Sequence, residues 1–353
     1  MDLSGKTILV TGAAGFLGRH VLSRLREVLG GASRIAAVDL RAPQGTAVGA
    51  NDSWIACDLA DESAAAGVVA ELAPGAIIHL AGLTTGSDAQ AFERANVRAC
   101  VNLITAAAKL PRRPRVLVMG SAAQYGLSAA DDRPADESHP LRGVTPYALS
   151  KTRQERRALE MGRELGVPVV CTRLFNTIGP GQPPSLVPAA FLYQVADVLA
   201  GKAPVVTVGN TSSRRDFIDA RDIAAAIVGL TLAPGTVPPS GTVPPFGTVP
   251  SCSSREKSWG QSQTAGQSPV DGEVFNIASG QAVSIADVLD ECVRLGGGPE
   301  RIPVRQDPAR MKAVDVPVIT GDASKLRRAI GWSPRIPWRQ SLANMWEEIL
   351  RDR

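Results

Sequence analysis

The sequence contains few of the residues that proteins use to bind metals. Histidine occurs only three times, and the five cysteines include no pair at CxxC spacing. Zinc sites are built from histidine and cysteine side chains at short spacings, so we expect no metal site. The odd number of cysteines also disfavours a disulfide framework and is typical of reduced thiols in a cytosolic protein.

Long apolar runs and a strong charge imbalance are also missing. No stretch approaches the roughly 20 apolar residues that cross a bilayer, and the start, MDLSGKTILVTG, lacks the pattern of a signal peptide. The 38 basic and 34 acidic residues leave a net charge of +4, which is too small to indicate binding to nucleic acid. These absences predict a cytoplasmic protein with a small-molecule ligand and with no membrane or nucleic-acid partner.

Short apolar segments alternate with amphipathic helical patterns along the first half of the chain. The strand-like segments are residues 6–11, 34–40, 53–57, 76–80 and 115–119. Between the first two, residues 16–29 have apolar side chains at helical spacing. Near-continuous apolar strands that alternate with helices are typical of a parallel sheet covered on both faces. We therefore predict an α/β fold with a Rossmann-type doubly wound sheet.

The second half is less regular and predicts a smaller substrate lobe at the carboxyl edge of this sheet. We expect a dinucleotide-binding domain over residues 1–175 with parts of 205–230, and a substrate-binding α/β lobe over 176–204 and 273–353. Residues 233–272 are rich in Pro, Gly, Ser and Thr and contain a tandem hexapeptide, GTVPPS-GTVPPF-GTVP. This composition predicts a disordered low-complexity insert, which is either a neutral loop expansion or a proline-rich arm that binds a partner.

A glycine-rich turn follows the first predicted strand. Gly12, Gly15 and Gly18 precede and open the helix, so the backbone can approach a pyrophosphate while the helix amino terminus offers free N–H groups. Asp39 ends the next strand, where a carboxylate accepts hydrogen bonds from an adenosine ribose. Asp39 repels a 2′-phosphate and favours NAD(H), whereas the nearby Arg41 leaves NADP(H) open.

Two residues with acid–base potential lie four apart in a helical pattern. Tyr147 and Lys151 in YALSK therefore share one helix face. A free tyrosine titrates near ~10, and we expect the lysine ammonium to lower the pKa of Tyr147 into a catalytic range. Ser121 follows the fifth strand and can donate a hydrogen bond to a carbonyl oxygen as negative charge develops.

The combination of these motifs resembles the extended short-chain dehydrogenase/reductase family, also called the NAD-dependent epimerase/dehydratase family. The matching segments are TGAAGFLG, the VDL strand end, CDL, HLAG, GSAAQYG and YALSK. The resemblance implies that Ser121, Tyr147 and Lys151 form the catalytic triad, that the cofactor is NAD(H) or NADP(H), and that the protein is a homodimer.

The motifs and the resemblance together indicate which residues bind each ligand. Cofactor contacts are expected at Gly12, Gly15, Phe16, Leu17, Gly18, Asp39, Arg41, Asp58, Leu59, Leu80, Ala81, Gly82, Asn96, Tyr147, Lys151 and Phe175. Substrate contacts are expected at Thr84, Ser121, Asn176, Val187, Arg215, Arg310 and Lys312.

The second half resembles enzymes that act on GDP-sugars, namely GDP-4-keto-6-deoxy-mannose reductases and GDP-mannose 4,6-dehydratases. The dehydratases place an acidic residue after the catalytic hydroxyl, whereas this chain has Ala122, Ala123 and Gln124. The relatives usually carry Arg-Pro where this chain has Lys312 and Ala313. We therefore expect reduction of a 4-keto-6-deoxy sugar nucleotide by NAD(P)H. The alternatives are an NAD-dependent sugar-nucleotide 4-epimerase and, with less support, a dehydratase or a non-catalytic dinucleotide-binding protein.

Overall fold

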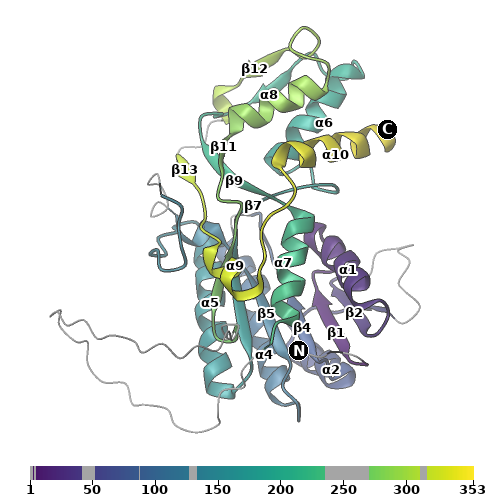
Figure 1. The fold of residues 1–353 in the computed structure, drawn as a ribbon, viewed down its shortest axis with the longest axis vertical. Coiled ribbons are helices and arrows are strands. Elements are labelled where there is room, and N and C mark those ends of the chain that lie inside the picture. Colours follow the sequence, from purple (N-terminus) through teal and green to yellow (C-terminus); the bar gives the residue numbers. More distant parts are fainter. Residues whose placement is uncertain are drawn as a thin grey trace, which may run out of the picture.

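The computed structural model describes residues 3, 5–41, 52–86, 88–126, 133–234, 270–310 and 316–353. Within them, seven parallel strands form one sheet in the order β10-β6-β5-β4-β1-β2-β3 (Figure 1). The strands are β1 (Thr7–Thr11), β2 (Arg34–Asp39), β3 (Ser53–Ala56), β4 (Ala76–His79), β5 (Arg115–Ser121), β6 (Val169–Leu174) and β10 (Val274–Ile277).

Helices cover both faces of this sheet. One face packs against α1 (Phe16–Leu29), α7 (Ala220–Leu232) and α9 (Ser324–Ile330), and the other packs against α2 (Glu62–Leu72), α4 (Ala99–Ala108) and α5 (Pro146–Leu165). Two separate apolar clusters fill the space between the sheet and these two helix layers. This doubly wound arrangement confirms the predicted Rossmann-type fold.

A smaller lobe lies beyond the carboxyl ends of the strands (Figure 1). Its strands are β7 (Asn176–Ile178), β8 (Val206–Val208), β9 (Arg214–Asp219), β11 (Ala282–Ser284), β12 (Val304–Gln306) and β13 (Val318–Ile319). Strands β7, β9, β11 and β13 form one sheet, and β8 pairs with β12. Helices α6 (Val187–Leu199), α8 (Ile285–Leu295) and α10 (Trp338–Arg351) share a third apolar cluster with these strands.

The division between the two lobes differs from the predicted one at two stretches of chain, β10 and α9. Strand β10 pairs in parallel with β6 at the edge of the large sheet, whereas the sequence predicts that residues 273–353 belong to the smaller lobe. Phe275 and Ile277 are buried in the same cluster as α1 and α7, and Leu326 of α9 joins them. Burial of these apolar side chains against the large sheet explains why the chain returns to it after the insert.

A buried arginine holds the two ends of the chain segment that contains the repeat. Arg115 begins β5, has no exposed surface, and donates to the carbonyls of Leu230, Thr231 and Ala233 at the end of α7. Its guanidinium also donates to both carboxylate oxygens of Asp271, at 2.6 and 3.0 Å. Residues 235–269, which contain most of the predicted insert, lie outside the described residues.

Within the described ranges, no helix is both long enough and apolar enough to cross a membrane.

Candidate active site

A cavity of about 700 Å³ opens at the carboxyl ends of the large sheet, between it and the smaller lobe. It brings together most of the predicted site residues from distant parts of the sequence. The predicted residues that line it are Gly12, Gly15, Phe16, Leu17, Gly18, Leu80, Gly82, Thr84, Ser121, Tyr147, Lys151, Phe175, Asn176 and Arg215.

The glycine-rich turn leaves no room for side chains. Gly12 has a φ of +65°, and a Cβ there would lie 2.7 Å from the backbone nitrogen of Ala81. A Cβ on Gly18 would lie 2.3 Å from the carbonyl oxygen of Gly12. Helix α1 begins at Phe16, directly after this turn, and its first residues line the cavity. The first backbone N–H groups of a helix have no carbonyl partner within the helix. Such a cradle fits the pyrophosphate of a nicotinamide dinucleotide, because oriented N–H groups stabilise its negative charge.

Several of the predicted cofactor contacts lie outside the cavity lining. Asp39 ends β2, and its Oδ2 accepts a hydrogen bond from the backbone of Ala14 at 3.0 Å. Asp58 is paired with Arg94, with Nη2 and Oδ2 2.5 Å apart. Arg41, Leu59 and Ala81 also lie outside the lining.

Ser121, Tyr147 and Lys151 all line the cavity, as predicted. Helix α5 is defined locally by Thr145, whose hydroxyl accepts from the backbone of Ala148, and by a proline at its first position. This start places Tyr147 and Lys151 on the helix face that packs against the end of β5. Ser121 is the last residue of β5, and its hydroxyl is hydrogen-bonded to Tyr147.

The predicted effect of Lys151 on Tyr147 is wrong in this structure. Burial raises the pKa of Tyr147 above its ordinary value, and the opposing influence is the hydrogen bond with Ser121. Lys151 instead donates from Nζ to the carbonyl of Met119 and to Oε1 of Gln154, each at 2.9 Å. Burial lowers the pKa of Lys151 to about 8. The ammonium is therefore directed toward the base of the cavity rather than toward the phenol.

Asn96 lies in a short π-helical turn, η1 (Glu93–Arg98), and it holds the loop after β4. Its Oδ1 accepts from the backbone N–H of Leu83, and its Nδ2 donates to the carbonyl of Leu83 and to the hydroxyl of Ser150. A Cβ on Gly82 would lie 2.6 Å from this Oδ1. Asn96 is fully buried and does not line the cavity, so it shapes the wall rather than facing a ligand.

The predicted substrate residues divide into two groups. Thr84, Asn176 and Arg215 line the cavity, and Nη1 of Arg215 donates to the carbonyl of Val316 at 2.7 Å. Val187, at the start of α6, is 43% exposed and does not line the cavity. Its neighbour Leu186 lines the cavity instead. Arg310 is exposed and donates to the carbonyl of Thr207 on β8. Lys312 lies outside the described residues.

Some lining residues escaped the sequence interpretation. They are Met119, Gly120, Ala122, Ala123, Leu174, Thr177, Pro183, Leu186 and Ile319. Five of them, namely Gly120, Ala122, Leu174, Thr177 and Leu186, are next in sequence to a predicted site residue. For these five, the neighbouring predicted residue was the available signal. Ile319 on β13 is different, because only the pairing of β13 with β9 brings it to the cavity.

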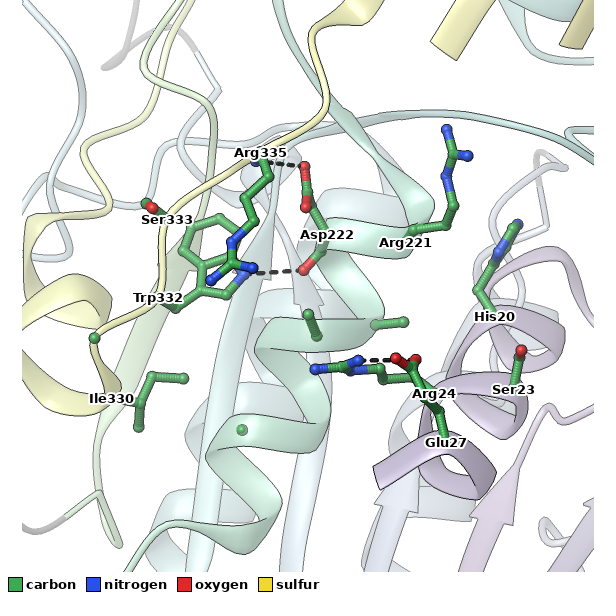
Figure 2. A pocket seen from close by; sticks show the side chains of 14 residues that line it. His20, Ser23, Arg24, Glu27, Arg221, Asp222, Ile330, Trp332, Ser333 and Arg335 are labelled. Atoms are coloured by element: carbon green, nitrogen blue, oxygen red, sulfur yellow. Dashed lines mark hydrogen bonds and ion pairs between the residues drawn. The ribbon is translucent and has the colours of Figure 1, made fainter. Parts of the chain in front are cut away.

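A second cavity of about 470 Å³ lies between α1, α7 and the segment that follows α9 (Figure 2). Several of the polar side chains that line it bond to other groups of the protein. His20 donates to the carbonyl of Pro180, Arg221 pairs with Asp219 through two contacts of 2.8 Å, and Arg24 pairs with Glu27. The indole of Trp332 and the backbone of Arg335 donate to Asp222. These contacts hold α1, α7 and the segment after α9 together. The predicted catalytic residues Ser121, Tyr147 and Lys151 line the larger cavity instead.

The chain is similar to known proteins along most of its length. The family model described as the NAD dependent epimerase/dehydratase family matches residues 8–242. The GDP-6-deoxy-D-mannose reductase of Pseudomonas aeruginosa is 27% identical over 98% of both chains. A UDP-glucose 4-epimerase of Caenorhabditis elegans is 27% identical over 96% of both. The solved structure of MoeE5 with UDP-glucuronic acid and NAD is 25% identical and has a TM-score of 0.75, covering 98% of this chain and 100% of that one.

These matches extend along almost the whole chain, and the family match includes the glycine-rich turn, Ser121, Tyr147 and Lys151. The chain therefore belongs to the NAD-dependent epimerase/dehydratase family and is an NAD(P)-dependent oxidoreductase of the extended short-chain dehydrogenase/reductase type.

Proposed function

We propose that this enzyme uses NAD(P)H to reduce GDP-4-keto-6-deoxy-D-mannose to GDP-D-rhamnose. The observation that carries the proposal is the charge of the larger cavity. Among its described lining residues, the charged side chains are Lys151 and Arg215, and none is an aspartate, glutamate or histidine. Elimination of water from a sugar requires a base at the neighbouring carbon, and Ala122 and Ala123 occupy the lining directly after Ser121. Reduction of a ketone requires no such base.

The residues at the cavity base can carry out the proton transfer of a ketone reduction. The nicotinamide of a bound cofactor supplies the hydride. Tyr147, whose pKa is raised by burial, is protonated at neutral pH and donates its phenolic proton to the carbonyl oxygen. The hydroxyl of Ser121 donates a hydrogen bond to the same oxygen as negative charge develops. The products are an alcohol and the oxidised cofactor, so one proton and one hydride are consumed for each ketone.

The cavity also has the polarity of a nucleotide-sugar site. Arg215 places a guanidinium in the wall contributed by the smaller lobe, and Asn176 places an amide beside it. A guanidinium and an amide favour the diphosphate of a sugar nucleotide over a neutral sugar. A relative at 27% identity named GDP-6-deoxy-D-mannose reductase supports the same substrate class.

We favour NAD(H) as the cofactor. The carboxylate of Asp39 lies beside the glycine-rich turn, where it accepts from Ala14 and would repel a 2′-phosphate. Arg41 follows two residues later and is exposed, so it is the residue that would contact the phosphate of NADP(H).

A sugar-nucleotide 4-epimerase is the second candidate. It uses the same three catalytic residues, and a UDP-glucose 4-epimerase is as similar to this chain, at 27% identity, as the reductase. An epimerase returns the hydride to the sugar and leaves the cofactor unchanged, whereas a reductase consumes the cofactor.

A cofactor-oxidation assay with a panel of sugar nucleotides tests the proposal. We expect GDP-4-keto-6-deoxy-D-mannose to consume about one NAD(P)H per sugar, as the hydride balance requires. GDP-mannose alone should give no keto sugar. Keto-sugar formation from GDP-mannose would refute the argument from Ala122 and Ala123. Interconversion of two hydroxy sugars without net cofactor change would instead establish the epimerase.

We further propose that the enzyme acts as a cytoplasmic homodimer. Val144, just before α5, and Leu149, in its first turns, are 75% and 43% exposed, and a partner subunit would cover such apolar side chains. Light scattering of the purified protein tests this proposal, and a monomeric mass at micromolar concentration would refute it.

A further inference from the structure

Gln124 is a fully buried polar residue that lies three positions after Ser121. Its Oε1 accepts from the backbone N–H of Ser121 at 2.9 Å, and its Nε2 donates to Oε2 of Glu155 at 3.0 Å. The carboxamide is thus held at both ends. The Ser121 N–H can only donate and the Glu155 carboxylate accepts, so only one orientation of the amide satisfies both partners.

Glu155 is itself held in one position. It is 4% exposed, and the guanidinium of Arg173 on β6 contacts both of its oxygens, at 2.9 and 2.7 Å. Such a two-point contact fixes the plane of the carboxylate as well as its place. Arg173 also donates to the hydroxyl of Tyr125 and to the carbonyl of Glu137. The orientation of Gln124 therefore rests on groups from three separate parts of the fold.

Helix α5 connects this network to the acid–base residues. Tyr147, Lys151 and Glu155 follow one another at intervals of four, so they lie along one face of α5. Lys151 bonds to the carbonyl of Met119 on β5, and Glu155 bonds through Gln124 to Ser121 at the end of the same strand. These two connections set the position of Ser121 relative to Tyr147.

Gly120 provides the space that this arrangement needs. A Cβ at this position would lie 2.7 Å from Oε1 of Gln124 and 2.3 Å from the carbonyl oxygen of Thr172. The carboxamide therefore passes directly over a residue that has no side chain, which is a close approach that other residues would block.

We propose that Gln124, oriented by Glu155, is a positioning residue. It holds the Ser121 hydroxyl in the position relative to the Tyr147 phenol that proton transfer requires. The proposal rests on the proposed function because it requires that Ser121 and Tyr147 take part in turnover. Gln124 does not line the larger cavity and acts only through Ser121.

Exchanging donor and acceptor along the network tests the proposal. In Gln124→Glu, two carboxylates face each other at the position of the Nε2 contact, and such a pair takes up a proton to avoid adjacent like charges. At low pH the shared proton replaces the Nε2 donor of Gln124, so the contact with Glu155 is restored. We expect the ratio of variant to wild-type kcat to fall by about tenfold or more between pH 6 and pH 9, since misplacement by about 1 Å costs on the order of 100-fold. KM should change little.

Two further variants separate positioning from packing. Gln124→Met keeps the volume but removes both hydrogen bonds, so kcat should fall at every pH. The double variant Gln124→Glu, Glu155→Gln restores one donor and one acceptor at the contact, so it should recover part of kcat and lose the new pH dependence. Gln340→Glu on the exposed face of α10 is the matched control and should behave like the wild type. Circular dichroism identifies any variant that fails to fold.

A second readout does not depend on turnover, so it separates failure of this proposal from failure of the proposed function. The chain has three tyrosines, and carbon-13 labelling of their rings gives three signals that can be assigned with phenylalanine variants. The hydrogen bond with Ser121 lowers the pKa of Tyr147. Gln124→Met should therefore raise that pKa, and Ser121→Ala should raise it as well. An unchanged pKa of Tyr147 in folded Gln124→Met would overturn the proposal. Wild-type kcat in Gln124→Glu at both pH values, or a double variant no better than the single one, would also overturn it.

Discussion

The carboxylate of Asp39 accepts a hydrogen bond from the backbone N–H of Ala14, with 3.0 Å between Oδ2 and the nitrogen. The contact joins the end of β2 to the glycine-rich turn before α1. The other oxygen, Oδ1, accepts from the backbone of Leu40 at 2.8 Å. A carboxylate has about four acceptor sites, so Asp39 keeps capacity for the two hydroxyls of a ribose while it holds the turn in place.

Replacing Asp39 with alanine should weaken NAD(H) binding by about tenfold, the effect of losing one to two kcal/mol of charge-assisted hydrogen bonding. NADP(H) binding should weaken less, because the repulsion of its 2′-phosphate disappears together with the acceptor. Fluorescence titrations of both cofactors measure the ratio. Glu71→Ala, at an exposed position of α2, is the matched control. An unchanged ratio between the two dissociation constants would contradict the role of Asp39.

Tyr147→Phe should lower kcat by about 100-fold to 10,000-fold, the range that general acid–base groups contribute. Only the phenolic oxygen and its proton are lost, and the ring contact with Phe92, at 5.9 Å between centroids, can remain. Cofactor affinity should therefore stay close to that of the wild type. Tyr193→Phe on α6 is the control and should retain full turnover. A Tyr147→Phe enzyme within a few-fold of wild-type kcat would exclude Tyr147 as the proton donor.

The buried ammonium of Lys151 should make stability depend on pH in the alkaline range. Its pKa in the folded protein is about 8, compared with 10.5 for an unperturbed lysine. Between these values the unfolded chain binds more protons than the folded one, so raising the pH stabilises the wild type by up to about 1.4 kcal/mol per pH unit. The free energy of unfolding of Lys151→Met should lack this increase.

Urea unfolding of the wild type and of Lys151→Met, at several pH values from 7 to 10, measures this difference. Lys109→Met removes an exposed ammonium at the end of α4 and should follow the wild-type curve. Parallel curves for Lys151→Met and the wild type would show that Lys151 is not the group responsible.

Deleting residues 235–250 should leave the melting temperature and turnover nearly unchanged, because Arg115 already binds the chain on both sides of this stretch. Arg115→Met should instead lower the free energy of unfolding by about 3–5 kcal/mol, since it leaves the carboxylate of Asp271 buried without its partner. Arg112→Met, at an exposed position, is the control. A large loss of stability in the deletion variant would mean that the repeat segment packs against the fold.

Local patterns predicted the features that depend on local geometry. The glycine-rich turn, the helix over 146–165 and the strand ends are visible in the sequence because each reflects backbone conformation or apolar periodicity over a few residues. Parallel strands bring their carboxyl ends to one edge, so Ser121, Asn176 and the turn at Gly12 could be expected to meet.

Contacts that join distant segments could not be predicted in the same way. The hydrogen bonds of Lys151 depend on which groups on β5 and α5 face each other after packing. Burial of the Tyr147 phenol also follows from packing, and it reversed the expected direction of the Tyr147 pKa. The buried pair of Glu155 and Arg173 also has no local signal, because charged residues on a helix and on a strand are usually exposed. The place of β10 in the large sheet depends on burial across the insert.

The contacts of Arg115 make the fold insensitive to the number of repeats between Ala233 and Asp271. Its guanidinium holds Ala233 and Asp271, so the distance between these two residues is set by β5 and not by the chain that joins them. One more or one fewer GTVPP-type unit alters the loop-closure free energy by only ~0.1 kcal/mol, because that cost grows with the logarithm of length. Homologous genes can therefore gain or lose whole repeats at this site by replication slippage, and the resulting proteins would differ in mass while sharing one active site.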